Sequence, residues 1–536
     1  MFPRLGQTCS SRRVGFAYVF YKAFIRVQML IFEHGLDRLV EQSCFFDLGM
    51  YVRCLSGAPK PGAHLKVACY IHSVAHVRGP NIDYFWFETL AKLLQTLRGT
   101  GATQCMLISK PWLHSMARTR WASSLLEGLL IGVIDETSLL HRLRSIDVLP
   151  AALNRIAYGI GGKDHPALHV VADEVGRCSQ RFEPDIVIVF GIQADFLANL
   201  WPKALLLHVE TGAYSRNPYP FSMYFDHLGM YRHSAVGKAG KRLRAGIATA
   251  DGRSLVAAFR SNFATALATI DPFRRHDLRA RFRCLCLLPL QVSNDYSFDE
   301  QAAYRTQFEF LHDVLSATPR DVGVIVTEYL ETGDVIKAYG DGESLAYLRH
   351  TFPNMVFRED FHSYYAPSQF LVPRVDGVWT ISSNVGYQGL LYGCVLGTPA
   401  TTHLAGIADA TTYEDFLDRL GRPSPANSDA FLAWQLERYL VPDRLLNDGR
   451  WLYEYLERRL DAVHRVDDPI DAFVPIADMD RLTEAWVAQA PKPLTVPFNS
   501  EINVLLQSTS WRITAPLRAI ATALRALRAF ATRLFY

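Results

Sequence analysis

The chain has 536 residues, of which 49% are hydrophobic and 20% are charged. This is too long for one ordinary core, so we expect two domains with additional segments. A formal net charge of only +3 argues against a nucleic-acid-binding protein. Nine cysteines without a Cys-x-x-Cys pair argue against a disulfide framework and indicate a reducing cytoplasm.

Residues 1–64 are expected to form an extension in front of the first domain. The apolar run Val14–Phe32 contains Lys22 and Arg26. It is therefore neither an unbroken span of about 20 apolar residues nor the continuous apolar region of a signal peptide. The Pro- and Gly-containing stretch 57–64 is typical of a linker. We predict no transmembrane helix.

From residue 65 onward, short apolar runs of strand type alternate with longer helix-compatible segments. Unbroken apolar strands between helices indicate parallel sheets that are covered on both faces. The chain therefore belongs to the α/β class, as two doubly wound Rossmann-like domains that hold their ligand in a cleft at the carboxyl ends of the strands. The expected strands are 65–72, 103–109, 129–135, 185–191 and 204–210 in the first domain, and 284–290, 322–329, 354–360, 376–382 and 394–400 in the second. The expected domains are 65–275 and 280–465, followed by a helical region at 466–536.

The stretch Asp376–Pro399 places a polar turn between an expected strand and an expected helix. The residues of this turn are Ser382, Ser383 and Asn384. Either serine can cap the helix through its side-chain oxygen, and the helix start favours an anion. Gly386 removes a side chain at the first turn, which allows a ligand to approach the backbone. Gln388 can hydrogen-bond a sugar hydroxyl. The alternative is an ordinary capped helix that binds no ligand.

The same stretch resembles a signature of the bacterial capsule polysaccharide synthesis family that begins Ser-x-x-Gly-x-x-x-Leu-x-x-Gly. That family includes transferases of 3-deoxy-manno-octulosonic acid (Kdo) and has the two-domain GT-B glycosyltransferase fold. Three further stretches resemble family segments, and the resemblance covers roughly residues 180–460. They are Leu287–Phe298, which contains Gln291, His208–Tyr231, and Tyr439–Arg459. The resemblance implies that Gln291 and the polar turn bind a nucleotide-sugar donor, with CMP-Kdo as the first candidate.

The chain departs from the family pattern in its second domain. Many members carry a Lys-x-His-Pro element after the second strand of that domain, whereas this chain has Val326–Gly333, with no His and no Pro. Gln388 stands where an acidic residue is usual. The later aromatic-glycine segment is replaced by Thr401–Gly406, in which His403 is a candidate for the missing histidine on the donor side. These departures leave the identity of the donor sugar open.

Glycosyl transfer requires a carboxylate as base or nucleophile. Resemblance to retaining Kdo transferases implies that Asp226 is the nucleophile and that Glu210 is an acid or base. The structural alternatives are that Asp226 caps a turn and that Glu210 pairs with Arg216.

Acceptor contacts are expected from His72 and Arg78, after the first strand, and from Arg216. His72 and His76 have a spacing seen in metal sites, but no Cys or carboxylate motif accompanies them, so no metal is expected. We also expect no cofactor, because the nucleotide sugar is itself a substrate.

The carboxyl-terminal stretch 511–536 contains five arginines and no acidic residue. On a helix, its arginines would lie largely opposite its leucine and phenylalanine side chains. This pattern is typical of an amphipathic helix at a membrane surface. The alternative is a helix that packs on the protein's own second domain or on a partner protein.

Together these features predict a cytoplasmic glycosyltransferase at the surface of the inner membrane that extends a capsule or lipopolysaccharide glycan. Its expected partners are a nucleotide sugar, a glycan or glycolipid acceptor and the membrane surface, with no nucleic acid. Two alternatives stay open. One is a non-catalytic glycan-binding or scaffold module of a polysaccharide synthesis complex, and the other is a sugar-nucleotide epimerase, which shares the fold.

Overall fold

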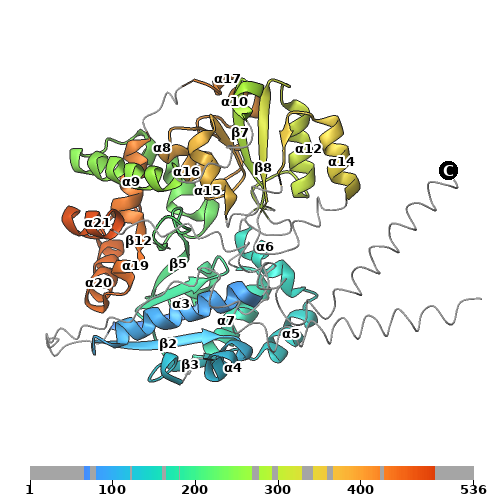
Figure 1. The fold of residues 1–536 in the computed structure, drawn as a ribbon. Helices are drawn as coiled ribbons and strands as arrows, with labels where there is room; N and C mark the ends of the chain where they lie inside the picture. The colour runs from blue at the N-terminus through green and yellow to red at the C-terminus, as the bar shows by residue number, and fades with distance from the viewer. Residues whose placement is uncertain are drawn as a thin grey trace, which may run out of the picture. The chain divides into compact units, whose positions relative to one another are not determined.

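Figure 1 shows the fold of the chain, a computed structural model, as a ribbon. The structure describes residues 65–72, 80–120, 123–159, 164–179, 181–268, 277–291, 298, 300–328, 342–358, 366–422 and 428–488. All of them belong to one compact unit, Ala58–Tyr536. The expected extension 1–64 and the basic stretch 511–536 lie outside the described residues.

The first sheet has seven strands in the order β12-β6-β5-β4-β1-β2-β3. Strands β1 to β5 are parallel, whereas β6 runs antiparallel to β5, and β12 runs antiparallel to β6. The strands are β1 (Leu65–Ile71), β2 (Thr103–Ser109), β3 (Leu130–Val133), β4 (Ile186–Phe190), β5 (Leu205–Thr211), β6 (Ser222–Asp226) and β12 (Leu440–Pro442).

The second sheet has five strands, all parallel, in the order β11-β10-β7-β8-β9. The strands are β7 (Cys284–Pro289), β8 (Val322–Thr327), β9 (Met355–Val356), β10 (Gly377–Trp379) and β11 (Val395–Gly397). In each sheet the first strand, β1 or β7, lies in the middle, the next two strands lie on one side of it, and the later strands lie on the other side. This is the strand order of a doubly wound fold.

Helices connect the strands and cover the sheets (Figure 1). Those of the first part are α3 (Pro80–Arg98), α4 (Pro111–Arg120), α5 (Glu136–Ser145), α6 (Leu153–Tyr158), α7 (Pro166–Cys178), α8 (Ala235–Ala245) and α9 (Ala250–Ala268). Those around the second sheet are α10 (Leu278–Arg281), α12 (Gln307–Ala317), α14 (Gly342–Thr351), α15 (Pro367–Leu371), α16 (Val385–Leu391), α17 (Tyr413–Arg419) and α18 (Asp429–Trp434). The last three are α19 (Asp443–Leu446), α20 (Gly449–Arg465) and α21 (Met479–Trp486).

Strand β7 shows why its unbroken apolar sequence forms a central strand. Successive side chains of a strand point to opposite faces of the sheet. Cys284 and Cys286 pack into one hydrophobic core, and Leu285 and Leu287 pack into another. Both faces of the second sheet are therefore covered, as predicted. The two cysteines are small core residues, and the α/β class with two doubly wound sheets, the architecture of GT-B proteins, is confirmed.

The C-terminal part of the chain returns to the first sheet. β12, which lies within the segment expected as the second domain, pairs with β6 and forms the edge of the first sheet. Gly449 at the start of α20 lies against the backbone of Thr96 in α3, where a Cβ atom would collide with the Thr96 carbonyl oxygen. The second predicted domain therefore contributes to the first sheet as well as to the second.

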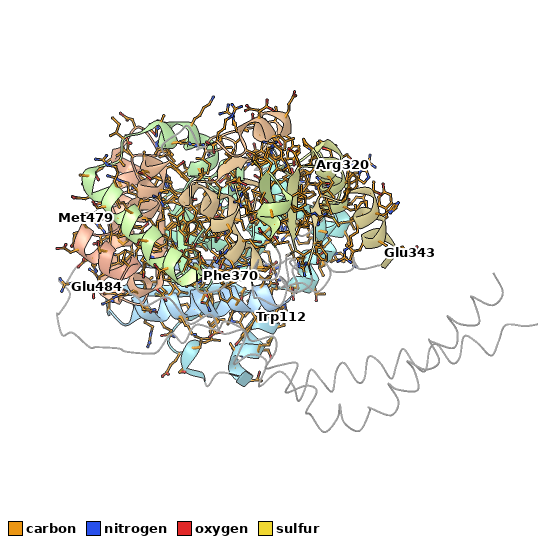
Figure 2. The ribbon with its side chains drawn as sticks, turned by 45° about the horizontal axis from the view of Figure 1, so that its top comes forward. Trp112, Arg320, Glu343, Phe370, Met479 and Glu484 are labelled. Atoms are coloured by element: carbon orange, nitrogen blue, oxygen red, sulfur yellow. The ribbon has the colours of Figure 1, made fainter. Side chains whose placement is uncertain are left out.

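Helix α21 completes this return. Figure 2 shows Met479 and Glu484 on α21. Glu484 forms an ion pair with Arg444 of α19, and the indole of Trp486 donates to the carbonyl oxygen of Leu436 at 3.0 Å. Among the described helices, none is long and apolar enough to cross a lipid bilayer.

Candidate functional site

The strand order of the second sheet reverses between β7 and β10, which is the place where doubly wound sheets bind ligands. Gln291 follows β7 and Ser382 follows β10. The Ser382 hydroxyl donates to Gln291 Oε1 at 2.8 Å, and the Ser382 backbone N–H donates to the same oxygen at 3.2 Å. Two residues predicted from separate motifs to bind the donor therefore meet at this reversal.

Ser383 of the polar turn accepts hydrogen bonds from backbone N–H groups at the start of α16. Ser383 Oγ accepts from the Val385 N–H at 3.3 Å, and the Ser383 carbonyl accepts from the Gly386 N–H at 3.0 Å. Ser383 therefore satisfies one backbone N–H at the helix start, whereas Asn384, the residue immediately before the helix, makes no side-chain capping hydrogen bond.

The packing around position 386 explains why a glycine stands there. A Cβ atom at this position would lie only 3.2 Å from a methyl carbon of Leu396 and of Leu404, and 3.3 Å from Thr380. These contacts are side chains of the second sheet and its loops, so a larger residue would press on the core. The close approach of a ligand at Gly386 stays a prediction.

Two residues of the motif reach across to the loop that follows β5 in the first sheet. Asn384 Nδ2 donates to the Gly212 carbonyl at 3.4 Å, and Gln388 Nε2 donates to the Ala213 carbonyl at 2.9 Å. Gln388 is only 2% exposed. Its Oε1 atom is buried and has no hydrogen-bond partner within the described part of the chain. If Gln388 binds a sugar hydroxyl, that oxygen is the atom left to accept it.

Hydrogen bonds from loop 212–219 and from α9 also hold the rest of α16. The hydroxyls of Tyr219 and Tyr392 lie 2.9 Å apart, and the Tyr214 hydroxyl donates to the Tyr387 carbonyl at 3.5 Å. Arg260 of α9 donates to the Leu391 carbonyl. We call the meeting of loop 212–219 with α16 the junction. It fixes the polar turn relative to the end of β5.

Glu210 lies on β5 next to this junction. It is paired with Tyr224 of β6 and is partly exposed. Its Oε1 atom accepts from the Thr211 N–H at 2.8 Å and from the Thr211 hydroxyl at 3.1 Å. Gly212, whose carbonyl contacts Asn384, is two residues further along. The predicted acid or base is therefore close in the chain to the contact with the polar turn.

Asp226 ends β6 and is completely buried, with an exposure of 0%. Its Oδ1 atom accepts from the Leu228 N–H at 2.8 Å. Its Oδ2 atom accepts from the Ala235 N–H at 2.8 Å and from the Tyr439 hydroxyl at 3.0 Å. Burial raises the pKa of this carboxyl to about 6, although these donors oppose the shift. Both oxygens are thus engaged within the protein, and the nucleophile role stays a prediction.

Asp226 belongs to a buried polar network that the sequence analysis missed. His208 accepts from the Ala194 N–H at Nε2, at 3.0 Å, so its Nδ1–H donates to the Asp226 carbonyl at 3.2 Å. Arg459 of α20 is fully buried and contacts His227 Nδ1 at 2.9 Å. These contacts tie the returning C-terminal helix to β6. No motif spacing indicates them, because Arg459 and β6 are far apart in the sequence.

His403 lies in the loop after β11 and is held by Gln301. Gln301 Oε1 is 2.8 Å from the His403 backbone nitrogen and 2.7 Å from its Nδ1 atom. Burial lowers the pKa of this imidazole to about 3, so it is neutral at physiological pH. The ring centre lies 5.4 Å from that of Tyr231, which belongs to the segment between β6 and α8. Gln301 was not among the predicted site residues.

The predicted acceptor residues are less well connected to this site. His72 follows β1 at the reversal of strand order in the first sheet, where its N–H donates to the Phe190 carbonyl at 3.1 Å and its Nδ1 atom lies 3.0 Å from the Tyr70 hydroxyl. Arg216 lies in loop 212–219 and is partly exposed. Arg78 lies outside the described residues. The structure therefore leaves a shared acceptor site as a prediction.

Glu328 is a further candidate for a residue that transfers a proton. It directly follows β8, in the stretch Val326–Gly333 that stands where the family carries its His-Pro element. Burial raises the pKa of its carboxyl to about 7, which is a suitable value for proton transfer near neutral pH. The sequence signal for this residue is an acidic side chain at a strand end, whereas the family resemblance led us to expect a histidine there. Among the described residues, no group of three His, Cys, Asp or Glu side chains lies together as a metal site would require.

Comparisons with known proteins give fold-level likenesses only. No protein-family model matches the chain, and no match was found among curated proteins. A KpsC beta-Kdo 2,7 transferase from Thermosulfurimonas dismutans is 16% identical over 53% of this chain and 89% of its own, with a TM-score of 0.31. A beta-Kdo 2,4 transferase of KpsC from the same organism is 19% identical over 47% and 79%, with a TM-score of 0.32.

A third solved structure is a UDP-GlcNAc 2-epimerase from Methanocaldococcus jannaschii in complex with UDP-GlcNAc and UDP. It is 12% identical over 69% of this chain and 98% of its own, with a TM-score of 0.31. At these TM-scores and identities the likenesses carry no argument about the reaction or the substrate, so the fold assignment stands on the strand order of the two sheets.

Proposed function

We propose that the chain is a glycosyltransferase of the GT-B type that moves a sugar from a nucleotide donor to a growing capsule or lipopolysaccharide glycan. The observation that carries this proposal is the hydrogen bonding of Ser382 to Gln291 at the strand reversal of the second sheet. Both residues were predicted from motifs that resemble the Kdo-transferase family, and a strand reversal is where such sheets bind nucleotides.

The donor is assigned to the second sheet. The partly exposed Ser383, the Ser382–Gln291 pair and the Oε1 atom of Gln388 supply hydroxyl and amide groups for the nucleotide sugar. CMP-Kdo is the first candidate donor. The proposal includes no metal and no cofactor, since the nucleotide sugar is itself a substrate.

Glu210 is the proposed acid or base. It is partly exposed and belongs to the strand whose following loop contacts the polar turn. Asp226 is the carboxylate that the family resemblance names as nucleophile. An attacking carboxylate must present an oxygen to the sugar, so Asp226 would have to release Leu228, or both Ala235 and Tyr439, before it could react.

Acceptor and membrane contacts complete the proposal. An acceptor that is built on a lipid would favour an enzyme held at the membrane surface, and the stretch 511–536 would provide this contact. Its arginines would contribute about 1 kcal/mol each near anionic lipids, in addition to the burial of its apolar side chains. We expect deletion of 511–536 to shift the protein from vesicle-bound to free in a sedimentation assay. Equal binding by the full-length and truncated proteins would contradict the proposed contact.

A non-catalytic glycan-binding or scaffold module is the second candidate function. It is favoured by the complete burial of Asp226 and by the use of Asn384 and Gln388 in contacts within the protein. A module of this kind keeps its fold and its glycan contacts without turning over a donor.

A turnover assay tests the two functions against each other. The full-length protein is incubated with CMP-Kdo or UDP-GlcNAc, and both transfer and donor hydrolysis are measured. The glycosyltransferase proposal expects turnover that Ser382→Ala lowers, whereas Ser316→Ala, at an exposed serine of α12, serves as the matched control and leaves it unchanged. Absence of transfer and of hydrolysis with every donor would favour the scaffold function.

A further inference from the structure

The pairing of His403 with Gln301 determines where the imidazole carries its proton. A backbone N–H can only donate, so the Gln301 atom that faces the His403 backbone nitrogen at 2.8 Å must be the amide oxygen. The same oxygen lies 2.7 Å from His403 Nδ1. Because an amide oxygen only accepts, Nδ1 must carry the hydrogen. In a neutral ring the other nitrogen, Nε2, is then an acceptor.

The surroundings keep the ring in this form. Gln301 and His403 are 1% and 5% exposed, and burial disfavours the charged imidazolium. Gln301 is itself held by its carbonyl oxygen, which accepts from the Thr401 hydroxyl at 2.6 Å. Within the described residues, the hydrogen bonds of the imidazole itself end at Gln301, and none reaches Nε2.

The loop that carries His403 is pressed against the first part of the chain. Gly406 lies against Gly240 of α8 so closely that a Cβ atom on Gly406 would be 3.1 Å from the Gly240 Cα atom. The ring of Tyr231 meets the His403 ring edge-on at 5.4 Å. Tyr231 has a φ of +47°, a conformation that costs a non-glycine residue free energy and often occurs at functional sites.

The ring is also near the proposed donor site. The Tyr387 ring, on α16, lies 6.3 Å from the His403 ring. Tyr387 is one residue before Gln388, whose Oε1 atom is buried without a partner among the described residues. Two acceptor atoms of different side chains, Nε2 of His403 and Oε1 of Gln388, are therefore carried by neighbouring segments.

We propose that His403 Nε2 accepts a hydrogen bond from a hydroxyl of the bound sugar, and that Gln301 is the positioning residue that fixes its tautomer. This inference rests on the proposed function and specifies the part of the donor that is recognised. A neutral acceptor nitrogen suits a hydroxyl group and does not suit a phosphate, because two acceptors repel each other. His403 thus differs in its chemistry from the donor-side histidine for which the sequence suggested it as a replacement.

The tautomer is tested without any substrate. Long-range proton–nitrogen correlation spectra of the full-length protein distinguish Nδ1–H, Nε2–H and doubly protonated imidazoles, and loss of a signal in His403→Gln assigns this ring. We expect the Nδ1–H form near neutral pH. An Nε2–H or doubly protonated ring would overturn the proposal. Gln301→Glu places a carboxylate at Nδ1, so we expect Nε2 to gain a proton in that variant.

The ligand contact is tested by binding. CMP-Kdo and UDP-GlcNAc are each titrated against CMP and UDP, with wild-type protein, His403→Phe and Gln301→Glu. We expect both variants to bind the sugar nucleotide about tenfold more weakly, as for one lost hydrogen bond, and to bind the free nucleotide as wild type does. His350→Phe, at an exposed histidine of α14, is the matched control.

Each outcome of the titration has one meaning. Equal binding of the sugar nucleotide by wild type and His403→Phe would overturn the hydroxyl contact and leave the glycosyltransferase proposal intact. An equal loss for nucleotide and sugar nucleotide would also overturn it, because the contact would then not be to the sugar. If the wild-type protein binds neither CMP-Kdo, UDP-GlcNAc, CMP nor UDP, both the contact of His403 with the sugar and the proposed donor site are wrong.

Discussion

Glu210 and Asp226 lie on the paired strands β5 and β6 but differ in their surroundings. Glu210 is partly exposed, and its Oε1 atom accepts hydrogen bonds from its neighbour Thr211. Asp226 is fully buried and accepts three hydrogen bonds from Leu228, Ala235 and Tyr439. A buried carboxylate that accepts hydrogen bonds within the protein stabilises the fold, whereas a partly exposed carboxylate can meet a substrate and transfer a proton. An acidic residue near a strand end therefore does not by itself identify a catalyst.

The largest effect is expected from Glu210→Gln. The amide keeps the shape of the side chain but cannot transfer a proton, so turnover should fall by about 10²–10⁴-fold. The free energy of unfolding should change by less than about 0.5 kcal/mol, as for a partly exposed site. Turnover and denaturant titrations of the same preparation measure both. Glu183→Gln, at an exposed glutamate, is the control. Unchanged turnover in Glu210→Gln would remove the distinction between the two carboxylates.

Asp226→Asn should act on stability instead. The amide nitrogen cannot accept from a backbone N–H, so near pH 4 we expect the variant to be less stable by about 1–3 kcal/mol. Burial raises the pKa of the wild-type carboxyl from 3.8 to about 6, so the folded state binds the proton more tightly than the unfolded state does. Wild-type stability therefore falls as the pH rises from about 4 to about 6. The variant lacks this titrating carboxyl. The difference in free energy of unfolding between wild type and variant should therefore become smaller as the pH rises from about 4 to about 6.

The activity of Asp226→Asn separates a structural role of this carboxylate from a catalytic one. If Asp226 is a structural residue, turnover of Asp226→Asn near neutral pH stays within about tenfold of wild type. Loss of turnover by several orders of magnitude, with no pH-dependent change in the stability gap, would give Asp226 the nucleophile role that the family resemblance implies.

Gln388→Glu should weaken the junction. At neutral pH a carboxylate would face the Ala213 carbonyl, to which Gln388 now donates at 2.9 Å, and two acceptors would repel each other in a buried site. We expect a loss of about 1–3 kcal/mol in the free energy of unfolding. Gln388→Met, which removes the donor without adding charge, should cost less. Equal stability of Gln388→Glu and wild type would show that this contact does not hold α16.

The smallest effect is expected for the pair of hydroxyls at the end of α16. Tyr219 and Tyr392 donate to or accept from each other at 2.9 Å. A double-mutant cycle with Tyr219→Phe and Tyr392→Phe should give a coupling free energy of about 1 kcal/mol. Additive effects of the two substitutions would mean that the two hydroxyls do not interact in solution.

Much of the fold followed from local patterns. Apolar runs such as 322–329 predicted buried parallel strands, because a strand covered on both faces carries apolar residues at every position. β6 and β12 were not predicted. β6, Ser222–Asp226, is a short strand among aromatic turns, and β12 joins it from more than two hundred residues later. Such pairing depends on tertiary contacts that no local pattern specifies.

The site was predictable only in part. Gln291 and Ser382 came from separate motifs, and the structure brings them within hydrogen-bonding distance. The use of Gln388 as a donor to Ala213 could not be predicted, because the sequence does not show which loop faces α16. The same holds for Gln301, which acts on His403 from a position about a hundred residues earlier in the chain.

We propose that the end of the second sheet, where Gln291 meets Ser382, holds a nucleotide. The stability of the full-length protein with CMP, UDP, GDP or ADP is the measurement that decides this. A nucleotide at one hundred times its dissociation constant should raise the free energy of unfolding by about 2.7 kcal/mol. We predict that one nucleotide does so for wild type and that Gln291→Ala lowers its affinity without unfolding the protein. No stabilisation by any nucleotide, or the same stabilisation in the variant, would rule out a nucleotide site at Gln291 and Ser382.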